Sequence, residues 1–142
     1  MFDTVVVGAD ESMTAADAVR AAAAIVKMSG GQLHIVTAYK PKPAADTGSL
    51  PEEFRYTTTA NPADVLLSDL ALMVKDEGLE PVVHAATSAP AEALVQVAIE
   101  QHADLIVVGN KGMKGAKRVL GSVPNSVAHH APCSVLIVDT TG

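Results

Sequence analysis

The chain has 142 residues, 49% of them hydrophobic and 18% charged, and we expect one folded globular domain that spans residues 1–142. A formal net charge of −6 argues against non-specific nucleic-acid binding, and two Phe, two Tyr and no Trp leave few side chains for stacking on bases. The single cysteine, Cys133, excludes an internal disulfide and a cysteine-cluster zinc site. With no secretory signal and no apolar run of roughly 18 residues, we expect a cytoplasmic protein without a membrane partner.

Short β-branched runs alternate along the chain with Ala-rich or amphipathic segments. Such runs are typical of strands buried on both faces, and the segments between them are typical of helices. This alternation predicts an α/β fold, with a parallel sheet and helices on both of its faces. The predicted elements are strand 4–8, helix 15–28, strand 33–39, helix 62–77, strand 81–86, a helix beginning near 90, strand 105–109, helix 122–130 and strand 134–138.

Capping residues precede three of these helices: Ser12 or Thr14, Asn61, and Ser88. Four apolar positions, 93, 94, 97 and 98, form the buried stripe expected of the helix near 90. The polar connection 40–61 is too long for a tight turn. It is either a surface excursion or a flap over a ligand.

Ligands of doubly wound sheets bind beyond the carboxyl ends of the strands, where the strand order reverses. The residues that follow the first predicted strand, Gly8–Asp10, and the fourth, Gly109–Gly112, are therefore candidates for a site. Asp10 suits either a helix N-cap or a ligand contact, and the two roles are compatible.

The segment after the fourth strand has the features of an anion site. No acidic residue occurs between Leu105 and Val138, and that stretch carries four of the ten basic residues of the chain. Glycines let backbone amides approach an anion, and Gly121-Ser122 stands where the last helix begins, so its amides and dipole favour phosphate. A turn that only connects a strand to a helix is the alternative. The order of residues fits neither the Walker loop nor the dinucleotide fingerprint.

At this loop the sequence resembles the universal stress protein family, in its ATP-binding branch. The family signature is Gly, two residues, Gly, nine residues, then Gly-Ser or Gly-Thr. Gly109, Gly112 and Gly121-Ser122 match it, although the second interval holds eight residues, 113–120. The opening segment 5–12 and the segments 122–127 and 133–138 are also similar to the family, so the resemblance extends over essentially the whole chain.

The resemblance implies a doubly wound five-stranded parallel sheet of order 3-2-1-4-5, in a three-layer sandwich of the adenine nucleotide alpha hydrolase-like and flavodoxin-like kind. It implies a homodimer that pairs through the last strand, Val135–Val138, and ATP as the ligand, with or without magnesium or manganese. Asp10 and Ala9 would lie at the ribose or adenine, and Ala38 would offer its backbone to the adenine edge. The implied nucleotide-binding set is Ala9, Asp10, Ala38, Val108, Gly109, Lys111, Gly112, Gly121, Ser122 and Val123.

The resulting expectation is a homodimeric, ATP-binding regulatory module of the stress response that is not an enzyme, because no convincing catalytic base accompanies the loop. Three alternatives are a binder of cyclic AMP or AMP, which the shorter loop slightly favours, a slow ATPase or phosphotransferase acting on Ser122 or Ser126, and a nucleotide-free dimer, against which the retained glycines argue. His34 and His84 are expected to be packed or edge residues, and Cys133 a buried, inert thiol. No residues with metal-ligand spacing are evident.

Overall fold

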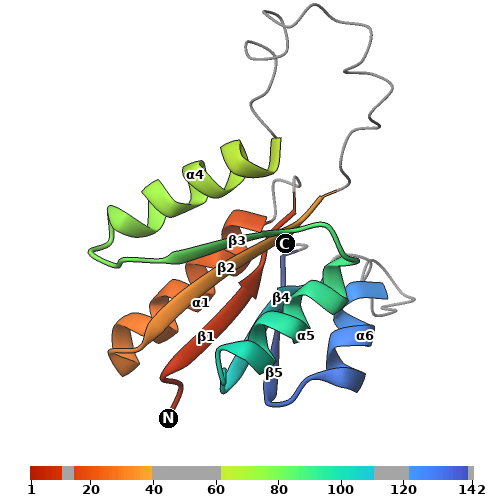
Figure 1. Ribbon diagram of the computed structural model, residues 1–142. Coiled ribbons are helices and arrows are strands. Elements are labelled where there is room, and N and C mark those ends of the chain that lie inside the picture. The colour runs from red at the N-terminus through yellow and green to blue at the C-terminus, as the bar shows by residue number, and fades with distance from the viewer. Residues whose placement is uncertain (11–14, 40–61, 111–121, 141–142) are drawn as a thin grey trace, which may run out of the picture.

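The computed structural model describes residues 1–10, 15–39, 62–110 and 122–140, which form an alternating series of strands and helices (Figure 1). The elements are β1 (Thr4–Gly8), α1 (Ala15–Ser29), β2 (Gln32–Ala38), α4 (Pro62–Lys75), β3 (Val82–Ala86), α5 (Pro90–Glu100), β4 (Leu105–Gly109), α6 (Ser122–His130) and β5 (Ser134–Val138). None of the helices within these ranges is long and apolar enough to cross a membrane.

The five strands form one parallel sheet in the order β3-β2-β1-β4-β5, which confirms the expected topology. The strand β1 lies at its centre, where Val5, Val6 and Val7 are fully buried. The chain therefore winds outward from β1 in both directions, first through β2 to β3 and then through β4 to β5. The order reverses between β1 and β4, at the place where such sheets bind ligands.

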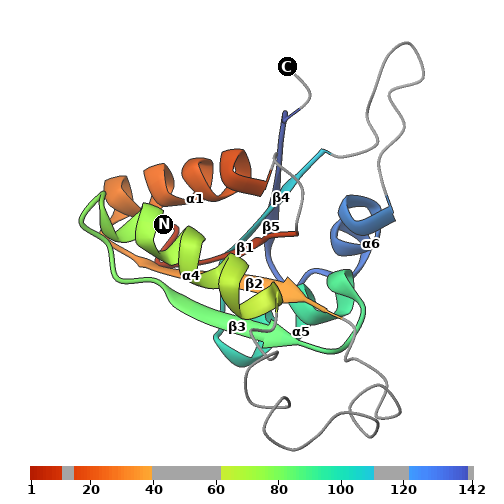
Figure 2. The same cartoon turned by 90° about the horizontal axis from the view of Figure 1, so that it is seen from above.

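Two layers of helices cover the sheet, with α1 and α4 on one face and α5 and α6 on the other (Figure 2). Val5 and Val7 of β1 pack into the first core with α1 and α4, and Val6 packs into the second with α5. Because successive side chains of a strand point to opposite faces, a strand covered on both sides must be apolar at every position. This requirement explains the uninterrupted valine run that identified β1 in the sequence.

Several element boundaries differ from those predicted. β2 begins and ends one residue earlier, and β3 begins at Val82, after the proline. α4 ends at Lys75, because the Gly78 N–H donates to the Lys75 carbonyl (2.9 Å) and Gly78 turns the chain at φ +88°.

The expected cap of α5 by Ser88 is wrong. The N-cap is Ala89, which provides no side-chain hydrogen bond, and Pro90 occupies the start of the helix. Proline at the start of a helix leaves no unpaired N–H of its own, and its φ already suits a helix, so α5 can begin here without a polar cap. The expected caps Ser12, Thr14 and Asn61 and the connection 40–61 lie outside the described residues.

Candidate functional site

A cavity of about 450 Å³, here called the strand-end cavity, opens where β1, β2 and β4 end. This volume lies in the range of roughly 300–1,000 Å³ that is usual for small-molecule sites. The walls come from those strand ends and from α1, α5 and α6. The lining residues are Gly8, Ala9, Asp10, Ala15, Ala18, Val36, Ala38, Pro90, Leu94, Val108, Gly109, Ser122, Val123 and Pro124.

One side of the cavity is aliphatic, and glycine at the end of β1 keeps it open. A Cβ at Gly8 would lie 2.8 Å from Leu94 Cδ1, so a larger residue there would collide with the cavity wall. Leu94 and Val36 are both buried members of the same core cluster, which fixes their side chains. Such a wall suits the flat, weakly polar face of a heterocycle.

The backbone at the end of β2 adds polar groups to this wall. The β1–β2 ladder ends where the Ala9 N–H donates to the Val36 carbonyl (2.9 Å), whereas the Tyr39 N–H donates to the Ala86 carbonyl (2.8 Å) on the β3 side. Because backbone groups of successive strand residues point to opposite sides, those of Ala38 face the β1 side, beyond the end of that ladder. Ala38 thus brings a backbone donor and acceptor to the cavity, which it also lines.

The opposite side of the cavity is polar. Ser122 is exposed at the first position of α6, and the amides of this nine-residue helix are not all satisfied within it. Free amides and the positive end of the helix dipole attract an anion, to which the Ser122 hydroxyl can also donate. Asp10 is the one ionisable side chain in the described lining, and it is exposed at the end of β1.

The structure brings together seven of the ten residues of the predicted set around the strand-end cavity: Ala9, Asp10, Ala38, Val108, Gly109, Ser122 and Val123. The other three, Lys111, Gly112 and Gly121, lie outside the described residues.

Sequence reasoning placed Gly8 among the site candidates but missed the rest of the apolar lining: Ala15, Ala18, Val36, Pro90, Leu94 and Pro124. Leu94 was predicted only as a core residue. The signal that could have found this part was available, since Val36 lies near the end of a strand and the other residues lie in the first turns of helices that follow strands.

His34 and His84 form a pair away from this lining. His34 Nδ1 and His84 Nε2 are 2.9 Å apart, and the rings stack with centroids 5.2 Å apart. Burial lowers the pKa of both imidazoles; His84 lowers that of His34 further, and Glu100 partly opposes the lowering at His84. Both rings therefore favour the neutral form, in which one nitrogen donates and the other accepts. His34 is packed as predicted, at 5% exposure, but the pairing was not foreseen.

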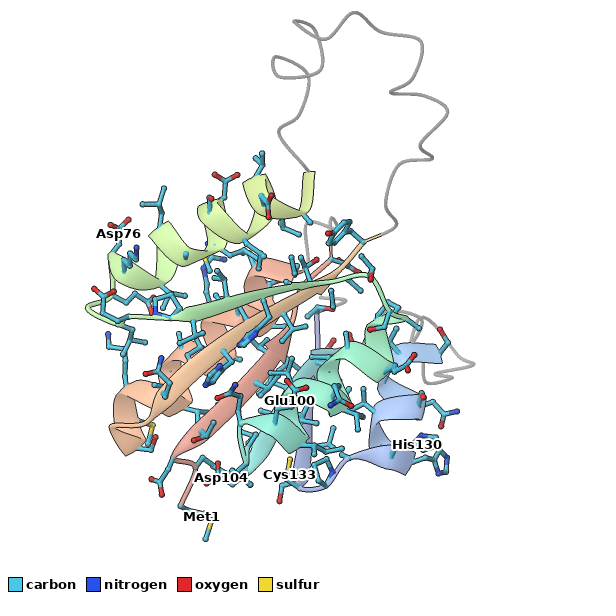
Figure 3. All side chains as sticks on the ribbon, in the orientation of Figure 1. Met1, Asp76, Glu100, Asp104, His130 and Cys133 are labelled. Atoms are coloured by element: carbon cyan, nitrogen blue, oxygen red, sulfur yellow. The ribbon has the colours of Figure 1, made fainter. Side chains whose placement is uncertain are left out.

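Cys133 directly precedes β5 and is half-buried, whereas the sequence predicted a buried thiol. Burial, together with the charge of Asp104, raises the pKa of Cys133, which keeps the sulfur protonated and weakly reactive. Figure 3 shows both residues at the end of the molecule that carries Met1. In the described ranges, no three His, Cys, Asp or Glu residues are grouped to hold a metal ion.

The sequence pattern of the universal stress protein family matches residues 1–139 of the chain. The chain belongs to the universal stress protein family. Universal stress protein Rv1636 of Mycobacterium tuberculosis H37Rv is 39% identical over 144 residues, which cover 99% of this chain and 98% of that protein. A universal stress protein of Thermus aquaticus is 33% identical over 141 residues, 97% of this chain and 99% of that protein.

Solved universal stress proteins share the fold. One, in complex with cAMP, is 35% identical and superposes with a TM-score of 0.78 over 99% of this chain and 98% of its own. UspA of Lactobacillus plantarum is 22% identical, with a TM-score of 0.74 over 96% of this chain and 97% of its own. The resemblance inferred from the glycine loop is thus confirmed at the level of the family and the fold.

Proposed function

We propose that this universal stress protein binds an adenine nucleotide in the strand-end cavity and acts as a nucleotide-dependent regulatory module. The observation that carries this proposal is the meeting of an apolar wall, an open strand backbone and a helix N-terminus around one cavity of about 450 Å³. The first two features suit the face and the polar edge of a base, the third suits a phosphate, and all three meet where a doubly wound sheet binds its ligands.

In the proposed arrangement, the base lies against Leu94 and Val36, with its polar edge toward the backbone of Ala38. Asp10, at the exposed end of β1, accepts hydrogen bonds from the ribose. The phosphate lies at the start of α6, where Ser122 adds its hydroxyl to the helix amides.

ATP is the ligand that the glycine signature favours, with magnesium or manganese as its companion ion. Cyclic AMP is the second candidate, and two observations favour it. The solved relative in complex with cAMP is 35% identical to nearly the full chain, and the loop between Gly112 and Gly121 is one residue shorter than the ATP signature. A single phosphate needs fewer donors than three.

We propose binding without efficient turnover. The described lining offers Asp10 as its one ionisable side chain and no histidine that could act as a general base. Slow hydrolysis or phosphate transfer to Ser122 is the alternative, and loss of turnover in a Ser122→Ala variant would support it.

We also propose a cytoplasmic homodimer that pairs through β5. Within the described residues this strand ends the sheet, so one side of its backbone has no partner strand there, and Leu136 is 37% exposed on it. A second copy related by a two-fold axis would cover that edge.

Isothermal titration of nucleotide-free protein tests the binding proposal, using ATP with and without Mg²⁺, cyclic AMP, GTP and adenosine. We expect saturable binding of an adenine nucleotide and weaker binding of GTP. Ser122→Ala should weaken binding of the phosphate-bearing ligand by roughly ten- to hundredfold, because a hydrogen bond to a charged group contributes about 1.5–3 kcal/mol. The variant should leave the affinity for adenosine unchanged.

Ser126→Ala is the matched control, since it removes a hydroxyl from the same helix outside the lining. Absence of saturable binding by any of these ligands would refute the proposal. An equal loss in the two serine variants would remove Ser122 from the site.

A further inference from the structure

A buried asparagine ties the wall of the strand-end cavity to the end of the chain. Asn110 follows the lining residue Gly109 and is 3% exposed. Its Oδ1 accepts hydrogen bonds from the Thr140 N–H (2.8 Å) and the Thr140 hydroxyl (3.0 Å). Its Nδ2 donates to Asp139 Oδ1 (3.1 Å), and its backbone N–H donates to the Val138 carbonyl (3.0 Å). We call this set of four bonds the Asn110 brace.

The brace requires a side chain that accepts and donates at once. Both bonds of Thr140 go to one oxygen, and the neighbouring nitrogen must donate to a carboxylate. An ionised aspartate at this position would supply the acceptor but would place a second carboxylate against Asp139. Alanine would leave the half-buried Thr140 N–H and hydroxyl without their partner.

The brace also bears directly on the cavity. Gly109 pairs with Val138 in the β4–β5 register, and a Cβ at Gly109 would lie 3.3 Å from Thr140 Cγ2. Thr140 thus packs behind the glycine that lines the cavity, and Asn110 holds Thr140 in that place. A shift of the segment Val138–Thr140 would move the cavity wall or open a gap behind it.

We propose that Asn110 is a positioning residue of the nucleotide site. It holds the segment Val138–Thr140 in place and thereby fixes the cavity wall at Gly109. Residues 139 and 140, which do not line the cavity, therefore affect the affinity for the nucleotide. This inference rests on the nucleotide-binding function proposed above. It gives a role to three residues that are neither glycines of the signature nor proposed ligand contacts.

The test is isothermal titration of ATP and cyclic AMP into wild-type protein and the Asn110→Ala variant, with thermal melts of each ligand-free protein. We expect Asn110→Ala to lower the affinity about tenfold for the nucleotide that the wild type binds. The control is Asp104→Ala. The Asp104 carboxylate accepts from the Asp3 N–H (2.9 Å) and the Thr4 N–H (3.1 Å) at the other end of the sheet (Figure 3). This control should lower the melting temperature and leave affinity unchanged.

An exchange of the two side chains separates positioning from general destabilisation. Asn110→Asp alone should weaken binding, because two carboxylates then face each other. Adding Asp139→Asn places the amide donor on the other side of the same contact, and the double variant should regain affinity to within about twofold of wild type.

Three results would overturn the proposal, and they are distinguishable. If Asn110→Ala melts lower but binds as wild type does, the brace is purely structural. If the exchange restores the melting temperature and not the affinity, Asn110 does not act through Asp139. If wild-type protein binds no nucleotide, the proposed function fails first and the positioning role fails with it.

Discussion

Adding one methyl group at Gly8 tests how tightly β1 and α5 meet beneath the strand-end cavity. The new Cβ would lie 2.8 Å from Leu94 Cδ1, 3.1 Å from Cδ2 and 3.4 Å from Cγ. Ordinary carbon contacts are about 3.5–4.0 Å, so the leucine must move by several tenths of an ångström. Leu94 is 2% exposed, and overpacking a buried side chain costs about 1–3 kcal/mol. We expect Gly8→Ala to lower the free energy of unfolding by that amount.

The assay is urea unfolding followed by far-ultraviolet circular dichroism, because the chain has no tryptophan. A double-mutant cycle with Leu94→Ala assigns the cost to this contact. Leu94→Ala alone should cost about 2–5 kcal/mol, and it removes the atoms that the new methyl group meets. Gly8→Ala should then be nearly neutral in that background. Equal costs in the two backgrounds, within about 0.5 kcal/mol, would refute the reasoning.

The same substitution should weaken nucleotide binding, because Gly8 and Leu94 both line the cavity. Gly31→Ala is the matched control. It would set a Cβ against the Asp3 carbonyl group and 2.9 Å from the Phe2 carbonyl oxygen, backbone atoms that cannot rotate away. Gly31 precedes β2, at the end of the sheet away from the cavity. This variant should lose stability and keep the affinity of the wild type.

Two further predictions concern stability. The pKa values of His34 and His84 are lowered from 6.5 mainly by burial, so the unfolded chain binds more protons below that pH. Their contribution to stability should be complete above about pH 6.5 and should decrease as the pH falls. In urea melts at about pH 7.5 and 5.5, His84→Gln should reduce the difference in the free energy of unfolding between the two pH values. A difference as large in the variant as in the wild type would contradict this prediction. In α4, Leu70→Ala (6% exposed) should cost about 2–5 kcal/mol, and Leu72→Ala (60% exposed) less than about 0.5 kcal/mol; equal costs would show that the burial assignment is wrong.

Much of the fold could be predicted from the sequence, because a sheet covered on both faces demands apolar runs. The strands Thr4–Gly8, Leu105–Gly109 and Ser134–Val138 have the predicted bounds. Strand order does not follow from periodicity, and it came from the resemblance to a family. The start of α5 was predicted correctly, but its cap was not, because a cap depends on backbone angles, which Ser88 and Ala89 do not reveal by residue type.

The polar and glycine positions of the candidate site were easier to predict than its apolar wall. Asp10 and Ser122 stand out after a strand and before a helix, whereas Leu94 has the pattern of any core residue. Contacts between distant residues were not predictable at all. Asn110 and Thr140 are 30 positions apart, and His34 and His84 are 50 apart, so only the register of the sheet brings them together.

A titration of ¹⁵N-labelled, nucleotide-free protein with cyclic AMP and with ATP, followed amide by amide, tests the central claim most directly. Occupation of the strand-end cavity predicts saturable shifts that cluster at Ala9, Ala38, Gly109 and Ser122, and little change at Gly31 and Asp104 at the other end of the sheet. Shifts that cluster at the other end, or none that saturates with either nucleotide, would contradict the claim.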